Sequence, residues 1–198
     1  EAKGYFKTLK INHYEYDDKS KECMSLAFQK SEADQRKLWL QGYNEDDILD
    51  YNQKTTSVSD FIHKELIHFS NSDNQRSIGS CIDGLKMSQR KILFSCFKRK
   101  LYSEIRVAQL AGYVSEHAAY HHGEASLQGT IVGMAQKYVG SNNIHLLQPN
   151  GQFGTRIMGG KDAASARYIH TELNPIVNFI YPSSDFDLLD YINDDGLQ

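Results

Sequence analysis

Apolar residues recur at helical spacing through most of this chain, and shorter alternating or polar segments separate the helices that this spacing predicts. Residues 20–43 show the spacing with a break near Ser31, which predicts two helices with Ser31 as the N-cap of the second. Residues 11–18 alternate and predict a strand. Residues 1–12 predict a helix end, and the polar, acidic residues 44–57 predict a loop.

A second set of helices is predicted to begin at Ser59, which is an expected N-cap. Apolar residues continue at helical spacing through Ile78, Ile82 and Leu85, and Asp83-Gly84 is expected to break that helix. Residues 88–100 predict a further helix, with one buried apolar face and one basic exposed face. Its expected buried residues are Ile92, Leu93, Cys96 and Phe97.

The last helices are followed by a hairpin signal. Residues 104–117 predict a short helix that stops near Gly112, and residues 123–140 predict a longer one with Gly140 as its C-cap. Residues 143–157 alternate around Pro149-Asn150-Gly151, which predicts a β-hairpin. Short helices followed by a hairpin are typical of a winged helix, which places one helix in the major groove of DNA.

The expected fold class is therefore α+β and mostly helical, with a helix-turn-helix and a β-hairpin wing that bind DNA. We expect residues 1–58 to form an N-terminal linker segment, and residues 59–198 to form the winged-helix domain.

Composition supports a soluble globular protein, with 40% hydrophobic and 24% charged residues. No apolar run is long enough for a membrane span, and the N-terminus lacks the apolar region of a signal peptide. Because it also lacks an initiator Met, we expect a piece of a longer protein. The three cysteines form no CxxC pair, which favours free thiols over a zinc site or a disulfide framework.

Charge is distributed unevenly along the chain. Residues 1–75 carry 10 Lys/Arg against 14 Asp/Glu, and residues 169–198 carry 0 against 6. The residues between them, 76–168, carry 12 against 5, a net charge of +7. This basic region is a candidate surface for a polyanion, and the alternative is a solvated charged surface without a partner.

The histidine pair in "YHHGE" (120–124) precedes a predicted helix. Consecutive histidines seldom converge on one metal ion, and no further ligand stands at a standard spacing. Helix N-termini favour anions, so His121 and His122 fit a phosphate contact better. A structural capping role for the pair remains open.

The segment "GGKDAASARYIHTEL" (159–173) carries small residues before Arg167-Tyr168. A phenol with a pKa of about 10 is a poor nucleophile until a neighbouring cation or base favours the phenolate. Attack on a phosphodiester also needs positive charge at the phosphoryl oxygens, which Arg167 and the histidines would supply. From the residues alone, Tyr168 is either this nucleophile or one of the chain's many ordinary tyrosines.

Three segments closely resemble the breakage-reunion region of eukaryotic-type DNA topoisomerase II, a type IIA enzyme. They are "ELIHFSNSDNQRSIGSCIDGLKMSQRKILFSCFK", "VAQLAGYVSEHAAYHHGEASLQGTIVGMAQKYVGSNNIHLLQPNGQFGTR" and "GGKDAASARYIHTEL". The resemblance is nearly continuous from about residue 59 to 183 and weaker over residues 1–58, which look like the segment after the family's Toprim domain.

The resemblance implies roles for individual residues. Tyr168 falls on the nucleophile that joins a DNA 5′ phosphate, Arg167 on its partner at the scissile phosphate, and His122 on the histidine that assists there. The implied DNA contacts are Arg76, Lys86, Arg90, His121 and Lys161. Gly79 departs from the usual "SIP" pattern and Met87-Ser88 from "KPGQRK", which puts the backbone shape of that turn in doubt.

The resemblance also implies partners that this chain does not hold. The family's Mg²⁺ ligands lie in the Toprim domain and its ATP site lies further upstream, so we expect no metal site here. Double-stranded DNA and a homodimer with a shared active site are implied. The expected location is the nucleus, or the cytoplasm for a virus-encoded enzyme. The alternative function is a non-catalytic winged-helix DNA-binding module.

Overall fold

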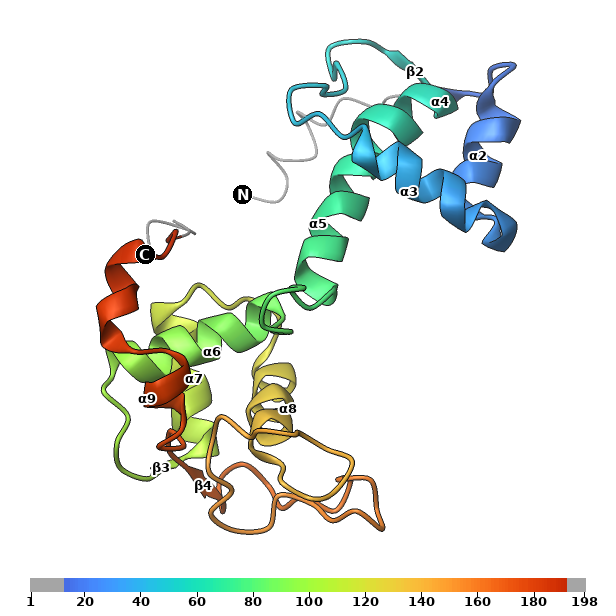
Figure 1. Ribbon diagram of the computed structural model, residues 1–198. Coiled ribbons are helices and arrows are strands. Elements are labelled where there is room, and N and C mark those ends of the chain that lie inside the picture. Colours follow the sequence, from blue (N-terminus) through green and yellow to red (C-terminus); the bar gives the residue numbers. More distant parts are fainter. Residues whose placement is uncertain (1–12, 192–198) are drawn as a thin grey trace, which may run out of the picture. The chain divides into compact units, whose positions relative to one another are not determined.

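The computed structural model describes residues 13–191 (Figure 1), so the helix end expected within residues 1–12 lies outside the described residues. The chain divides into two compact units, Glu1–Ile78 and Gly79–Gln198. This division lies twenty residues beyond the boundary expected between residues 58 and 59. The expectation of a mostly helical α+β chain is confirmed, since short strands accompany the helices in each unit.

The first unit combines a two-stranded parallel sheet with helices. Strand β1 (His13–Glu15) pairs with β2 (Thr55–Ser57), with His13 opposite Thr55. The expected strand at 11–18 is thus confirmed over its described core, whereas the loop expected through residue 57 ends in a strand. The helices are α2 (Ser20–Phe28), η1 (Lys30–Glu32), α3 (Ala33–Gln41), α4 (Val58–Phe61), the π-helical turn η2 (Ile62–Leu66) and α5 (Ile67–Ser77).

Two expected helix caps were wrong by one or two residues. Ser31 lies inside the short turn η1, and Glu32 precedes α3. Ser57, rather than Ser59, caps α4, because its hydroxyl accepts a hydrogen bond from the N–H of Asp60 at 3.0 Å. The hydroxyl of Ser59 instead donates to the carboxylate of Asp17. Strand β2 pairs with β1 as far as Ser57, and α4 begins at the next residue. The pairing of the strands therefore makes Ser57 the cap.

Side-chain hydrogen bonds explain why the helix after residue 58 belongs to the first unit. The indole N–H of Trp39 donates to Nδ1 of His63 over 3.0 Å. The hydroxyl of Tyr43 lies 3.1 Å from Nδ1 of His68. Because these contacts join α3 and the segment that follows it to the later helix, η2 and α5 pack with the preceding residues.

The first unit is expected to lose stability in acid through Asp17. Hydrogen bonds from Ser20 and Ser59 lower the pKa of this carboxyl to about 2. A lowered pKa means that the carboxylate stabilises the fold above about pH 4 and that this contribution disappears as the pH falls through about 2. Asp17→Asn should therefore reduce the fall in the urea midpoint between about pH 5 and pH 2.

The exposed neighbour Asp18 provides the control, since Asp18→Asn should keep the wild-type dependence on pH. An Asp17→Asn variant whose urea midpoint falls with pH as steeply as that of the wild type would contradict the assignment.

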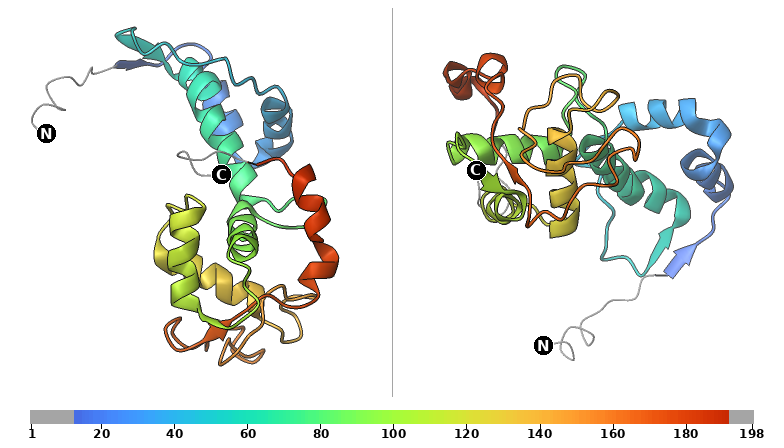
Figure 2. Two further views of the ribbon diagram at one scale, coloured as in Figure 1. Left: turned by 90° about the vertical axis from the view of Figure 1, so that its left-hand side faces the viewer. Right: turned by 90° about the horizontal axis from the view of Figure 1, so that it is seen from below.

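The second unit packs three helices around one core, with short strands and a C-terminal segment beside them. Its elements are α6 (Met87–Lys98), β3 (Ile105–Arg106), α7 (Val107–His117), α8 (Glu124–Ala135), β4 (His170–Thr171), α9 (Val177–Ile180) and η3 (Ser183–Leu188). Helices α7 and α8 lie side by side, as the views of Figure 2 show, and α6 contacts both. No helix among residues 13–191 is long and apolar enough to cross a membrane.

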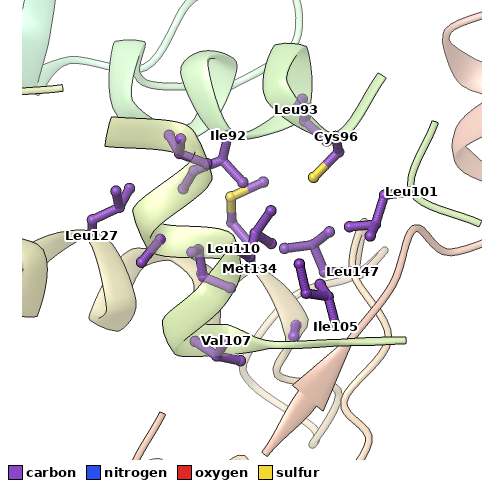
Figure 3. Close-up of a cluster of buried hydrophobic side chains, with 14 of the residues drawn as sticks. Ile92, Leu93, Cys96, Leu101, Ile105, Val107, Leu110, Leu127, Met134 and Leu147 are labelled. Carbon is purple, nitrogen blue, oxygen red and sulfur yellow. The ribbon is translucent and has the colours of Figure 1, made fainter. Parts of the chain in front are cut away.

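Figure 3 shows that the core side chains of these helices converge on one cluster. Ile92, Leu93 and Cys96 of α6 are buried as expected, and Phe97 is partly buried against them. Burial raises the pKa of the Cys96 thiol to about 12, so this cysteine is an apolar core residue. All three cysteines are unpaired, as the sequence predicted.

Three helix ends differ from those expected. Helix α5 ends at Ser77, so Ile78, Ile82 and Leu85 do not continue it. Helix α7 runs past Gly112 to His117, because Leu110 and Val114 are buried on either side of that exposed glycine. Helix α8 ends at Ala135, and Gly140 lies in a later turn and is not its cap.

The turn that precedes α6 explains the glycine at position 79. The N–H of Ser80 donates to the carbonyl of Leu85 at 3.0 Å, and the N–H of Gly84 donates to the carbonyl of Ser80 at 2.8 Å. A Cβ at Gly79 would lie 2.5 Å from the carbonyl oxygen of Gly84. A proline here, as in the resembling "SIP" pattern, would clash with that oxygen, so Gly79 matches this turn.

The hairpin expected at residues 143–157 is absent from the described structure. Leu147 instead pairs with Leu173, and Asn150 pairs with His170, both in antiparallel bridges. Strand β4 pairs with β3 on its other side, with Ile105 opposite Thr171. Residues 147–150 therefore pair with residues 170–173, and a long loop, residues 151–169, joins them.

Candidate active site

This long loop, which we call the tyrosine loop (151–169), holds Arg167 and Tyr168 outward between two buried residues. Ala166 and Ile169 are buried, whereas 72% of Tyr168 is exposed. The guanidinium carbon of Arg167 lies 5.9 Å from the centre of the Tyr168 ring. The structure therefore presents one phenol and one guanidinium together to solvent.

The first turn of α7 holds the backbone on both sides of this pair. The carbonyl of Ala166 accepts a hydrogen bond from the N–H of Ala108 at 3.0 Å. The carbonyl of Ile169 accepts one from the N–H of Val107 at 3.1 Å. The first N–H groups of a helix have no partner within the helix, so these two carbonyls satisfy them. The backbone of Arg167 and Tyr168 is thus tied to the end of a core helix.

A second set of hydrogen bonds closes the earlier part of the tyrosine loop. The Asp162 carboxylate accepts from the N–H and from the hydroxyl of Thr155, each at 2.8 Å. The backbone N–H of Thr155 is the main cause of the lowered pKa of Asp162. The side-chain amide of Gln136 donates to the carbonyl of Phe153 at 2.9 Å. Thr155, Asp162 and Gln136 were not predicted from the sequence. Asp162 could have been found, because it is an acidic residue next to Lys161 in a basic, glycine-rich loop.

His121 and His122 lie just before α8, as the sequence predicted, and both are exposed. The ring of His122 meets the ring of Tyr120 edge to face, with centroids 5.5 Å apart. Tyr120 is buried, and its hydroxyl lies 3.3 Å from that of Ser126 in the first turn of α8. This buried tyrosine fixes the approach to the helix, so the adjacent histidines stay close to its N-terminus.

A shallow groove of about 380 Å³ runs between α8 and the tyrosine loop. Ala125, near the start of α8, and Ala166, directly before Arg167, both line it. The groove thus joins the start of α8, which follows the histidines, to the residue directly before Arg167. Its other lining residues are small or uncharged: Gln128, Gly129, Val132, Gly133, Gln136, Gly160, Ala163 and Ala164.

The cationic residues that were expected to contact DNA differ in their unit and in their ion pairs. Lys86 and Lys161 are exposed in the second unit. Arg90 pairs with Asp83 at 2.7 Å, so a phosphate would share its guanidinium with that carboxylate. Arg76 lies in the first unit and pairs with Asp73 at 3.2 Å.

The described residues do not form a metal site. Within residues 13–191 no group of three or more histidine, cysteine, aspartate or glutamate side chains is placed to hold an ion.

Family models cover nearly the whole chain. Residues 76–198 match the model of the A subunit of DNA gyrase/topoisomerase IV. Residues 1–74 match the model of the C-terminal associated domain of TOPRIM. The division between the two models lies close to the structural division after Ile78.

Curated relatives and a solved structure point to the same family. The chain is 55% identical to a probable DNA topoisomerase 2 of Dictyostelium discoideum, over 99% of this chain and 13% of that protein. It is 54% identical to DNA topoisomerase 2 of Arabidopsis thaliana, over 99% of this chain and 14% of that protein. It thus spans about one seventh of the length of these relatives.

The solved structure is that of the DNA-binding, cleavage and re-ligation domain of Plasmodium falciparum topoisomerase II. The match has a TM-score of 0.79 and 48% identity, and it covers 93% of this chain and 25% of that one. Together with the family models, these similarities show that the chain belongs to the DNA gyrase/topoisomerase IV family and corresponds to the breakage-reunion region of eukaryotic DNA topoisomerase II.

Proposed function

We propose that this chain is the DNA-cleaving region of an ATP-dependent type IIA topoisomerase, and that Tyr168 is its nucleophile. The observation that carries this proposal is the exposure of Arg167 and Tyr168 between the buried residues Ala166 and Ile169. A side chain on a backbone already held in place loses less freedom when the substrate binds, which favours reaction.

In the proposed reaction, the phenolic oxygen of Tyr168 forms a bond to the phosphorus of a DNA phosphodiester. The bond from phosphorus to the 3′ oxygen breaks at the same time, and the 5′ phosphate stays on the tyrosine. The phenol loses its proton and the 3′ oxygen gains one. Attack by that 3′ hydroxyl reverses both changes and reseals the strand. A second copy cuts the opposite strand, so that another duplex can pass.

Positive charge beside Tyr168 supports this chemistry. The guanidinium of Arg167 would hold the non-bridging oxygens of the scissile phosphate as negative charge develops on them. His122 would assist at the same phosphate, and His121 would contact the adjacent backbone. The free N–H groups in the first turn of α8 favour an anion at that place.

The second unit is proposed to bind DNA as a winged helix. Helix α8 would face the duplex, and the paired residues 147–150 and 170–173, with the tyrosine loop, would form the wing. The groove beside α8 lacks bulky charged side chains, so a sugar-phosphate backbone can approach closely. The proposed backbone contacts are Arg76, Lys86, Arg90, His121 and Lys161.

The proposed partners are double-stranded DNA and a second copy of the protein, which together with the first cuts both strands. Mg²⁺ and ATP would be bound by other parts of the full-length protein, and the ion would supply further positive charge at the scissile phosphate. Among residues 13–191, no group of histidine, cysteine, aspartate or glutamate side chains could hold such an ion. A nuclear location is proposed from the eukaryotic relatives.

Denaturant trapping tests the function. The full-length protein, incubated with 3′-end-labelled duplex DNA and Mg²⁺ and then denatured with detergent, should carry the labelled fragment covalently through the 5′ phosphate at each break. A non-catalytic winged-helix module would release all of the DNA under these conditions. Absence of an adduct from a protein that binds the duplex would therefore support the alternative function.

A further inference from the structure

A second cavity of the second unit, which we call the aromatic cavity, has a volume of about 600 Å³. It lies between α6 and the segment that follows α9, and no described residue lines both this cavity and the groove beside α8. Cavities of this size with mostly apolar walls are typical of sites for small molecules. The aromatic side chains on its walls are Phe94, Phe97, Tyr181, Phe186 and Tyr191.

Contacts between rings join the two walls of the aromatic cavity. The centroid of the Phe97 ring lies 4.9 Å from that of Phe186 and 6.3 Å from that of Tyr181. The rings of Phe94 and Tyr191 lie 6.1 Å apart. Burial raises the pKa of the Tyr181 phenol, so this wall is apolar and carries no negative charge near neutral pH. Such walls favour a ligand that is itself an aromatic ring.

The lining of the aromatic cavity has a surplus of positive charge. Its described cations are Arg90, Lys91 and Lys98, and its described acid is Asp190. Arg90 already pairs with Asp83 at 2.7 Å. The two lysines then exceed Asp190 by one positive charge, so a ligand with one negative charge complements the cavity.

Lys91 connects the aromatic cavity to the segment that carries the histidines. Its ammonium group donates a hydrogen bond to the carbonyl of Ala119 at 3.1 Å. Ala119 has a φ of 45°, which is unfavourable for a residue with a Cβ. Ala118, which also lines the cavity, directly precedes it, and His121 and His122 follow two and three residues later. The bond from Lys91 therefore supports an unfavourable backbone conformation just before the histidines.

We propose that the aromatic cavity binds a small aromatic carboxylate and that this binding slows cleavage by Tyr168. The ring packs between the aromatic walls, and the carboxylate draws the ammonium groups of Lys91 and Lys98 toward it. The bond from Lys91 to Ala119 is then lost, and the segment that holds His122 leaves its position. A ligand shifts such an equilibrium only if it binds one of the two states better, and competition for Lys91 provides this difference. The inference rests on the function proposed for Tyr168 and His122.

The test uses the full-length protein and naphthalene-2-carboxylate as the probe. Equilibrium dialysis should give a dissociation constant of about 0.1–1 mM. Naphthalene-2-carboxamide has the same shape without the charge and should bind about tenfold more weakly. Saturating carboxylate should lower detergent-trapped cleavage about fivefold, with half of the effect at the dissociation constant, and should leave DNA affinity within about twofold.

Substitutions in the aromatic cavity test where the probe binds. Leu189 lines the cavity and is 54% exposed, so a larger side chain can be accommodated there. Leu189→Trp fills the cavity and should abolish binding and inhibition. Lys98→Gln should weaken binding of the carboxylate about threefold and leave binding of the carboxamide unchanged. Lys100 is exposed beside α6 and does not line the cavity, so Lys100→Gln should bind both probes as the wild type does.

Ala119→Gly separates binding from its effect on cleavage. Glycine adopts a positive φ without the cost that a Cβ imposes, so the segment depends less on the bond from Lys91. This variant should bind the carboxylate with wild-type affinity but lose most of the inhibition. Cleavage with the probe is compared with cleavage by the same variant without it.

Equal affinity for the carboxylate and the carboxamide, or unchanged binding to Leu189→Trp, would refute the aromatic cavity as an anion site. Inhibition of Ala119→Gly as strong as that of the wild type would refute the release of the histidine segment. Dialysis measures binding without cleavage, so its result stands apart from the proposed function. Absence of adducts from the wild type without any probe would refute that function instead.

Discussion

Replacing Tyr168 by phenylalanine in the full-length protein is expected to abolish DNA cleavage and relaxation. The change removes one hydroxyl from a side chain that is 72% exposed, so it should leave the fold and the free energy of unfolding unchanged. Phosphate contacts supply most of the affinity for DNA, so binding should stay within about twofold of the wild type. Detergent trapping of labelled DNA and an electrophoretic binding assay measure the two effects.

Tyr102 provides the matched control, since it is 65% exposed in the same unit. Tyr102→Phe should cleave DNA as the wild type does. Persistent relaxation by Tyr168→Phe, or loss of activity in both variants, would show that the hydroxyl of Tyr168 is not the nucleophile.

The second large effect is expected from adding one methyl group at Gly154. This glycine has a φ of 103°, which side chains rarely adopt, and a Cβ there would lie 2.6 Å from Cα of Gly160. Because the obstacle is backbone, the tyrosine loop has to shift as a whole. Gly154→Ala should cost about 3 kcal/mol of unfolding free energy and should reduce trapped cleavage more than tenfold.

Gly159→Ala separates this steric effect from the cost of a left-handed backbone. Gly159 also has a positive φ, 58°, but apart from its chain neighbours no atom lies within 4 Å of the place that a Cβ would take. Its replacement should cost about 1 kcal/mol and leave most cleavage intact. Urea unfolding and detergent trapping are measured on both variants. Equal losses in the two would refute the close approach of Gly154 to Gly160 as the cause.

Local patterns along the chain predicted the helices well and their ends less well. Helix α6 was predicted because Ile92, Leu93 and Cys96 repeat at helical spacing and are all buried. Gly112 was taken as a helix end, yet α7 continues through it. A glycine in a helix costs about 1 kcal/mol, and burial of Leu110 and Val114 on either side outweighs that cost.

Long-range contacts account for the larger differences between the fold expected from the sequence and the fold observed. Pro149-Asn150-Gly151 has the composition of a hairpin turn, but Asn150 pairs with His170, which lies twenty residues further along the chain. The structural division lies after Ile78, beyond the boundary expected at residue 58, and hydrogen bonds from Trp39 and Tyr43 to His63 and His68 join the residues on both sides of that boundary. Pairings of this kind leave no periodic signal in either segment.

The sequence by itself determined the helical character of the chain, its basic central region and the candidate residues Tyr168, Arg167 and His122. These follow from the chemistry and local spacing of side chains, together with the family resemblance of the motifs that hold them. Only the tertiary structure decided that Arg167 and Tyr168 face solvent, because the carbonyls of Ala166 and Ile169 bond to the first turn of α7, some sixty residues earlier. The backbone bonds that hold the candidate nucleophile thus depend on residues far away along the chain.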